Sequence, residues 1–302
     1  MIATSTRLST RRGVLNWWLR AGCILLGVVI VAYALVLGGV FFTQREMLYP
    51  IVHGSPTPDA DGPPIHVVQI DTPDHERLVG WYLAPNPGRP TLLFFGGQGG
   101  GLSFQSGRWQ RIADEGVGFF AIGYRGHDGS TGKPSEKGLH TDARAAYDWL
   151  ARRTRPEDIV IHGFSLGTGV ATRLAIERPA RALILEAPYT STADIAAKAY
   201  PFLPVRWLML DQYRSRDIID RVTLPLLIVH GGSDAVVPFE QGRTLYDLAK
   251  TPKRLVKMVG SNHATLTRDG LYDQVWRFLD LPLSASTAEA GHKAAVEVAN
   301  AP

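Results

Sequence analysis

The sequence has almost no cysteine: its 302 residues include one, Cys23. A single cysteine cannot close a disulfide within the chain, and Cys23 lies in an apolar stretch near the N-terminus. The rest of the chain therefore folds without disulfides and contains no thiol nucleophile. Outside the N-terminal region, about 240 residues are enough for one α/β domain with a full hydrophobic core.

An excess of charge is also missing from most of the chain. The first 42 residues contain four arginines and no acidic residue, which leaves 28 basic and 28 acidic residues in the remainder. A neutral domain has no general attraction for a polyanion. The composition therefore gives no support to nucleic-acid binding.

Loops that bind nucleotide phosphates are missing as well. The glycine cluster at 96–101 does not have the spacing G-x-G-x-x-G. Gly132-Lys133 is followed by Pro134, where a phosphate loop has serine or threonine. We therefore expect no cofactor and no metal.

The most informative motif that is present is Gly163-Phe164-Ser165-Leu166-Gly167, between an apolar run at 159–161 and a helical pattern at 166–178. A serine at a sharp turn from strand to helix is typical of a nucleophile elbow. Small residues two positions before and after the serine let the two backbones approach closely. We predict that Ser165 is a nucleophile and that the Leu166 N–H faces the oxyanion formed on attack.

A serine nucleophile needs a base, and the base needs an acid that orients it. Where this elbow occurs, the acid and then the histidine lie on loops after later strands. Asp234 follows the strand pattern at 225–230, and His263 follows another at 254–259. We predict His263 as the base and Asp234 as the acid, with Glu186 as the competing acid. The alternative is a turn aspartate and an exposed loop histidine.

Three further segments resemble stretches of one enzyme family. They are Leu93–Gly100, where the family has FHGNAGN, Tyr124–Gly132, where it has YRGYGxSxG, and Glu186–Ser191, where it has a glutamate, a small residue and PFTS. Together with the elbow, they make the chain similar to the α/β-hydrolases. It is most similar to the membrane-anchored serine hydrolases of the ABHD type and their serine aminopeptidase-like relatives, over residues 65–282.

This resemblance implies a second oxyanion donor in the loop after the third strand. The family's histidine there is Gly96 in this chain, and its asparagine is Gln98. The donor is a backbone N–H, so Gln98 still supplies one, in a loop that its glycines make more flexible. Gln98 and Leu166 are the predicted oxyanion donors.

An uncharged run of 22 residues, from Ala21 to Phe42, is long enough to span a bilayer core of about 30 Å as a helix. Four arginines lie in the basic segment 1–20 before the run, and Arg45 follows it. This asymmetry predicts a single-pass anchor or uncleaved signal, with the N-terminus cytoplasmic and the catalytic domain extracytoplasmic. A cleaved signal peptide with the site Ala32-Tyr33-Ala34 is the alternative, and residues 10–15 also resemble a twin-arginine export signal.

The remaining chain alternates strand and helix patterns. This alternation predicts an eight-stranded, mostly parallel sheet with helices on both faces and an antiparallel hairpin at one edge. The resemblance implies that this sheet belongs to an α/β-hydrolase fold over 65–282. A linker is expected over 43–64 and a disordered tail over 283–302. The strand patterns lie near 65–70, 77–83, 91–95, 118–122, 158–162, 182–186, 225–230 and 254–259, and the helical ones near 103–115, 139–153, 166–178, 238–250 and 269–280.

Residues 192–224 interrupt this alternation and are rich in aromatic and aliphatic side chains. One interpretation is a helix packed on the sheet. The other is a short helical lid over the site, and this lid is part of the fold that we predict.

The predicted function is hydrolysis of a carboxylic ester or related acyl bond through Ser165 and an acyl-enzyme. An extracytoplasmic anchor and an apolar lid favour a small or lipid-like acyl substrate over a peptide. A serine aminopeptidase or thioesterase stays open as an alternative. So does a membrane-tethered interaction protein that keeps the fold without turnover.

Overall fold

The computed structural model of the protein describes residues 6–51, 54–55, 57–99, 101–282 and 295–301. The chain divides into two compact units, with the boundary between Gln44 and Arg45. Parts of three predicted segments lie outside the described residues: Gly100 of the loop after the third strand, residues 52–53 and 56 of the linker, and residues 283–294 and 302 of the tail.

The described part of the first unit is residues 6–44 of helix α1 (Thr6–Leu48). Within the described chain, it is the one helix long and apolar enough to cross a membrane, over Asn16–Leu48 with a mean hydropathy of 2.7. Length and composition fit the predicted anchor, and a signal sequence near an N-terminus has the same two properties. The helix extends beyond the predicted span of 21–42 at both ends.

The structure differs from the predicted linker over 43–64 at the start of that range. The last turn of α1 belongs to the second unit, and Tyr49 is buried in the core of that unit, with 3% of its surface exposed. The residues that hold this turn, Asp211 and Tyr213, are more than a hundred positions away in the sequence. A local pattern therefore does not reveal the contact.

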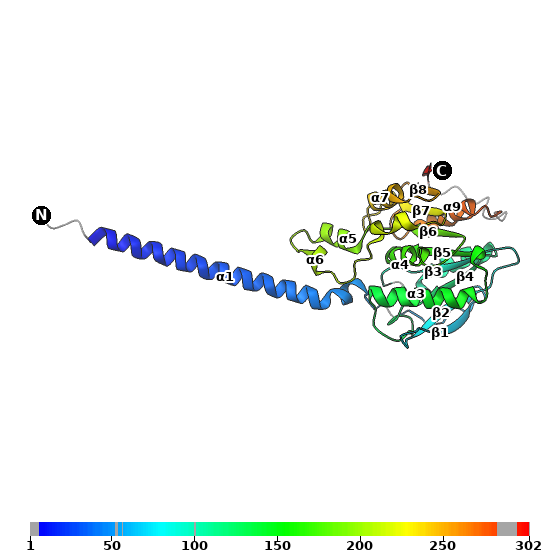
Figure 1. Ribbon diagram of the computed structural model, residues 1–302, viewed down its shortest axis with the longest axis horizontal. Coiled ribbons are helices and arrows are strands. Elements are labelled where there is room, and N and C mark those ends of the chain that lie inside the picture. The colour runs from blue at the N-terminus through cyan, green and yellow to red at the C-terminus, as the bar shows by residue number, and fades with distance from the viewer. Residues whose placement is uncertain (1–5, 52–53, 56, 100, 283–294, 302) are drawn as a thin grey trace. The chain divides into compact units, whose positions relative to one another are not determined.

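The second unit is built on a nine-stranded sheet with the strand order β1-β2-β4-β3-β5-β6-β7-β8-β9 (Figure 1). The pairs from β4/β3 to β7/β8 are parallel, and the pairs β1/β2, β2/β4 and β8/β9 are antiparallel. The predicted α/β-hydrolase sheet and its edge hairpin are confirmed. The strands are β1 (His66–Asp71), β2 (Arg77–Leu83), β3 (Thr91–Phe95), β4 (Gly118–Ile122), β5 (Ile159–Phe164), β6 (Ala182–Glu186), β7 (Leu226–Gly231), β8 (Lys253–Met258) and β9 (Val296–Ala301).

The ninth strand corrects the predicted sheet of eight strands and the predicted disorder of the tail. Strand β9 lies at the end of the range 283–302 and pairs antiparallel with β8 over six residues. Its side chains bury little, and Val298 is 49% exposed. The strand is therefore held mainly by ladder hydrogen bonds to the edge of β8, which composition does not signal.

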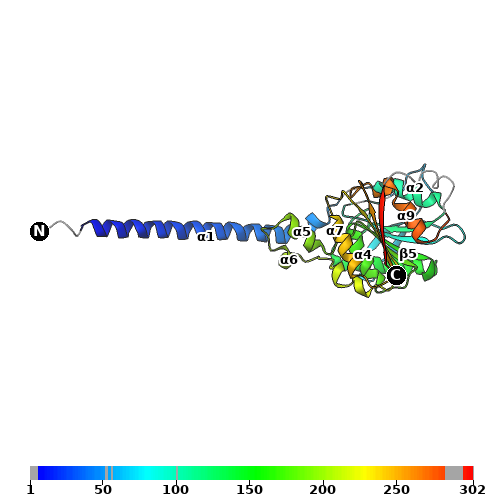
Figure 2. The same cartoon turned by 90° about the horizontal axis from the view of Figure 1, so that it is seen from above.

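Helices cover both faces of the sheet. One core contains side chains from α3, α4 and α7, among them Leu139, Val170 and Leu245. The other contains side chains from α2 and α9, among them Trp109 and Trp276. Figure 2 shows α2 and α9 on one side of the strands and α4 on the other. These helices are α2 (Ser106–Asp114), α3 (Glu136–Ala151), α4 (Leu166–Ala175), α7 (Phe239–Leu248) and α9 (Leu271–Phe278), with α8 (Leu266–Asp269) before the last.

The segment 192–224 forms two short helices, α5 (Thr192–Ala199) and α6 (Val205–Leu208), followed by two 3₁₀ turns. It begins soon after the carboxyl end of β6, and α5 and α6 lie apart from the helices that cover the sheet (Figure 1). Several of its large apolar side chains are exposed, including Trp207 at 91%. Its placement and exposure differ from those of a helix packed on the sheet, and the lid stays a prediction.

Candidate active site

Ser165 lies at the turn between β5 and α4, at the carboxyl end of a central strand. Its φ of 49° and ψ of −120° belong to a region that residues other than glycine rarely adopt, so the turn is strained. The Ser165 N–H donates to the Glu186 carbonyl at 2.9 Å, and the Thr168 N–H donates to the Ser165 carbonyl at 2.9 Å. These bonds hold the geometry of a nucleophile elbow.

The two glycines of the motif lie where no side chain fits. A Cβ on Gly163 would lie 2.5 Å from the Gly167 carbonyl oxygen. A Cβ on Gly167 would overlap the Phe95 carbonyl oxygen at the end of β3. The predicted close approach of strand and helix is confirmed, and it also brings the loop after β3 against the elbow.

The three side chains predicted from the motif order meet in a chain of hydrogen bonds. The Nε2 atom of His263 is 2.9 Å from the Ser165 Oγ, and its Nδ1 atom is 2.7 Å from the Asp234 Oδ2. With the proton on Nδ1, the imidazole donates to the carboxylate and accepts from the serine hydroxyl. This arrangement can deprotonate the serine as it attacks.

The Asp234 carboxylate is held on its other side by backbone groups. Its Oδ1 accepts from the Val236 N–H at 2.9 Å and from the Val237 N–H at 2.8 Å. Burial opposes ionisation, but hydrogen bonds from His263 and from the Val237 N–H keep the pKa of Asp234 below its ordinary value. The carboxylate is therefore charged and fixed at neutral pH.

His230, which the sequence analysis did not single out, supports the same loop. It is the penultimate residue of β7 and is fully buried. Its Nε2 atom is 2.8 Å from the Val237 carbonyl oxygen and 3.6 Å from the Asp234 Oδ2. Burial lowers the pKa of His230, so the ring is neutral and donates to Val237. Its position four residues before the predicted acid was the available signal.

Glu186, the competing acid, has a different partner. Its carboxylate accepts two hydrogen bonds from Arg108, at 2.8 and 3.0 Å, and both side chains are buried. Burial opposes its charge, yet the adjacent guanidinium lowers the pKa of Glu186 to about 2. In the described part of the chain, its hydrogen bonds go to Arg108 and not to His263.

The predicted oxyanion donors lie on either side of the elbow. A Cβ on Gly97 would be 3.2 Å from the Ser165 Cβ, so the backbone that leads to Gln98 passes close to Ser165. The Leu166 N–H begins α4, and the Leu166 carbonyl accepts from the Tyr189 hydroxyl at 3.0 Å. Among the described residues, neither the Gln98 nor the Leu166 N–H donates to a backbone carbonyl. Both groups are therefore available to a ligand.

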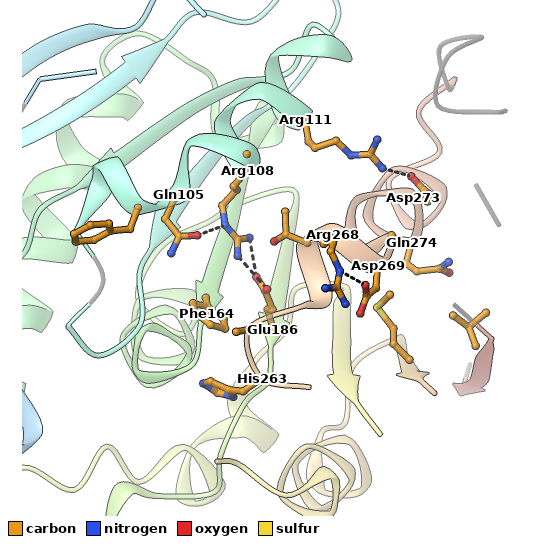
Figure 3. A pocket seen from close by; sticks show the side chains of 17 residues that line it. Gln105, Arg108, Arg111, Phe164, Glu186, His263, Arg268, Asp269, Asp273 and Gln274 are labelled. Atoms are coloured by element: carbon orange, nitrogen blue, oxygen red, sulfur yellow. Dashed lines mark hydrogen bonds and ion pairs between the residues drawn. The ribbon is translucent and has the colours of Figure 1, made fainter. Parts of the chain in front are cut away.

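A cavity of about 570 Å³ opens beside His263 (Figure 3). His263 and Phe164 line one end of it, and the Arg108–Glu186 pair lies beside them. Of the described residues, Ser165 is not part of its lining. The cavity is therefore bordered by His263 and Phe164 at this end and not by the Ser165 side chain.

The far part of this cavity is charged but balanced. Arg111 pairs with Asp273 at 3.4 Å, and Arg268 pairs with Asp269 at 2.7 Å (Figure 3). No group of three metal-ligating side chains occurs among the described residues. The cavity thus offers donors and acceptors to a polar group and provides no metal cluster.

Comparisons with known proteins show which proteins the chain is similar to. A family model described as serine aminopeptidase, S33, matches residues 89–211. The chain is 37% identical over 264 residues to the uncharacterized protein Rv2307c of Mycobacterium tuberculosis, covering 83% of this chain and 94% of that protein. It is 36% identical over 187 residues to the lysophosphatidylserine lipase ABHD12 of Danio rerio, covering 55% of this chain and 49% of the lipase. The match thus spans about half the length of that lipase.

Among solved structures, the esterase Pf2001 of Pyrococcus furiosus is similar with a TM-score of 0.61. The similarity covers 77% of this chain and 96% of the esterase, at 22% sequence identity. At this identity the likeness shows the fold alone.

Proposed function

The chain belongs to the α/β-hydrolases of the ABHD type, and from this premise we propose that it is a serine esterase acting on amphiphilic esters. The proposed substrate joins an apolar acyl group to a polar alcohol. The observation that carries the proposal is the continuous chain of hydrogen bonds from Ser165 through His263 to Asp234. The relative named as a lysophosphatidylserine lipase supports the same class.

In the proposed mechanism, the Ser165 Oγ attacks the ester carbonyl carbon while His263 accepts the hydroxyl proton. Asp234 stabilises the imidazolium, and the N–H groups of Gln98 and Leu166 donate to the oxyanion. The tetrahedral intermediate collapses, the C–O bond to the alcohol breaks, and His263 protonates the departing oxygen. A water molecule, deprotonated by His263, then releases the acid and restores Ser165.

The cavity beside His263 suits the leaving group. His263 delivers the proton from Nε2, the atom that faces Ser165, so the departing oxygen lies between these two residues, and the rest of the alcohol can extend into the cavity that His263 lines. Two ion pairs at its far end, Arg111–Asp273 and Arg268–Asp269, supply donors and acceptors for a polar alcohol. An apolar alcohol would displace the water around these ion pairs without replacing its hydrogen bonds.

A peptide substrate is the second class, because the family model is described as a serine aminopeptidase. An aminopeptidase needs a carboxylate that binds the substrate's α-ammonium group. In this cavity Asp269 and Asp273 are already paired with Arg268 and Arg111, whose guanidinium groups repel an ammonium ion. An ester with a neutral or anionic alcohol makes no such demand.

The proposal is tested by labelling the full-length protein with a fluorophosphonate and by assaying p-nitrophenyl esters of graded chain length. Ser165→Ala is expected to fold and to lose both labelling and hydrolysis, with residual rates lower by roughly 10⁴-fold or more. Aminoacyl p-nitroanilides in the same assay test the peptide class. Wild-type protein that neither labels nor hydrolyses, or Ser165→Ala protein that does both, would overturn the proposal.

A further inference from the structure

The turn that leaves α1 is bound tightly to the hydrolase unit. Arg45 donates to both oxygens of Asp211, at 2.8 and 3.2 Å. Four residues later, Tyr49 is buried, and its hydroxyl is 2.9 Å from the hydroxyl of Tyr213. The next residue, Pro50, has its carbonyl oxygen 3.3 Å from the His127 Nε2. Residues 45–50, which we call the exit turn, are therefore part of the folded unit.

The exit turn reaches the site at two points. Tyr49 lines a small internal cavity, of about 10 Å³, together with Gly96, Gly97 and Leu166. The side-chain amide of Gln98 donates to the Met47 carbonyl at 2.7 Å. Both contacts involve the loop after β3 or the first residue of α4, which carry the proposed oxyanion donors.

Both partners of the hydrogen bond between Gln98 and Met47 have a physical reason to form it. Helix α1 ends at Leu48, so the Met47 carbonyl lies in the last turn and has no partner within the helix, whereas the Arg45 carbonyl accepts from the Tyr49 N–H at 2.8 Å. The loop 96–99 has the sequence Gly-Gly-Gln-Gly, in which Gln98 alone has a side chain. A loop so rich in glycine has many accessible conformations, and the Gln98 amide restricts them by tethering to the helix end.

We propose that Gln98 is a positioning residue whose side chain, held by the Met47 carbonyl, directs its own backbone N–H toward the oxyanion. This inference rests on the proposed function and adds the exit turn to the site. The N–H itself does not change on substitution, so the side chain acts only through the loop's conformation. A donor that is fixed before reaction stabilises the transition state without a reorganisation cost.

The expected signature is a loss in kcat with little change in KM, because the oxyanion exists only in the transition state. Removing a whole oxyanion donor costs about 10²–10³ in kcat, so loosening one is expected to cost about tenfold. Affinity for an alkyl boronic acid, whose tetrahedral adduct places an anionic oxygen in the same position, should fall in parallel.

The experiment compares full-length Gln98→Met, Gln98→Glu and Gln98→Lys proteins in the same detergent. Met matches the length without a donor, Glu presents an acceptor to the Met47 carbonyl, and Lys restores a donor of similar reach. Gln98→Met and Gln98→Glu are expected to lose about tenfold in kcat and in boronate affinity, and Gln98→Lys to recover most of that loss. Gln110→Met is the matched control, because Gln110 makes an exposed side-chain bond of the same 2.7 Å length on α2, to Asp114.

Three outcomes overturn the inference. One is Gln98→Met with wild-type kcat and boronate affinity. Another is a Gln98→Lys protein no better than Gln98→Met. The third is a loss of activity in Gln98→Met that accompanies a fall in Tm and changes KM as much as kcat. Such a result would mean that the substitution disturbs the fold as a whole. Fluorophosphonate labelling of the wild-type protein separates these three outcomes from failure of the proposed function. A wild-type protein that does not label overturns the proposed function and, with it, this inference about Gln98.

Discussion

Glu186 is the last residue of β6, and Asp234 follows the neighbouring strand β7, so both lie at the carboxyl ends of the parallel strands. Their surroundings give the two carboxylates different roles. Asp234 is bonded to an imidazole and to two backbone N–H groups, so its charge is available to a histidine that gains a proton. Glu186 is paired with a buried guanidinium, so its charge neutralises Arg108. The residue type alone does not distinguish the two carboxylates.

The first prediction at the residue scale compares these carboxylates on one ester substrate. Asp234→Asn is expected to lower kcat by about 10⁴, because the amide favours the wrong imidazole tautomer, while Tm changes little. Glu186→Gln should keep kcat per folded molecule and lower the free energy of unfolding by roughly 3 kcal/mol, because Arg108 then lies buried without a counter-charge. An active Asp234→Asn beside an inactive, stable Glu186→Gln would mean that the acid has been misassigned.

A second prediction concerns acid stability. The pKa of Glu186 in the folded protein, about 2, lies below its ordinary value of 4.5. Its stabilising contribution is therefore complete above pH 4.5 and is lost as the pH falls towards 2. Tm measured between pH 7 and pH 2 should fall less steeply when Arg108→Met and Glu186→Leu remove the pair together. Equal slopes for the wild type and the double variant would contradict this account.

At the scale of elements, segment 192–224 is the part of the hydrolase unit with the most exposed aromatic surface. In the short helix α6, Trp207 is 91% exposed, whereas Val205 is buried. The segment is attached at its base, where the Thr190 hydroxyl donates to Gln241 on α7 at 2.5 Å. A fixed base and an apolar, exposed tip are consistent with a lid that contacts an acyl chain.

The prediction at this scale is a chain-length effect. Trp207→Ser is expected to leave the free energy of unfolding within about 0.5 kcal/mol, because the side chain buries little. It should lower kcat/KM for a dodecanoyl ester about fivefold, or ~1 kcal/mol of apolar contact, and leave the acetyl ester unchanged. Leu248→Ser on α7 is the control, since Leu248 is 42% exposed outside the segment. A uniform loss for both esters would count against the lid.

At the scale of the whole molecule, the chain joins an apolar helix to a charge-balanced hydrolase unit. The predicted orientation follows from the four arginines before the apolar run, compared with Arg45 beside Glu46 directly after it. An esterase held at a membrane meets amphiphilic substrates where they concentrate. This link between anchor and substrate class is a proposal that topology experiments can address.

The corresponding prediction is that the hydrolase unit lies outside the cytoplasm and stays attached to the membrane. Protease added to intact spheroplasts should digest it, and carbonate washing should leave the undigested protein in the membrane fraction. Protection of the unit until lysis would reverse the orientation. Release of a shortened protein by washing would instead support cleavage at Ala32-Tyr33-Ala34.

Much of the fold was predictable because its signals are local. Buried strands such as Leu226–Gly231 are continuous apolar runs, and the elbow requires glycines at fixed spacing around Ser165. The exposed edge strand β9 was not predictable, because its stability comes from pairing with β8 and not from an apolar pattern.

The sequence by itself determined the alternation of strands and helices, the strained turn at Ser165 and the order of the acid and base, since each depends on neighbours within a few residues. Only the tertiary structure decided which carboxylate meets His263, that Glu186 belongs to Arg108, and that the exit turn reaches Gln98. Those pairings join residues 29, 78 and 51 positions apart. They depend on the order in which strands assemble into the sheet, which no local pattern encodes.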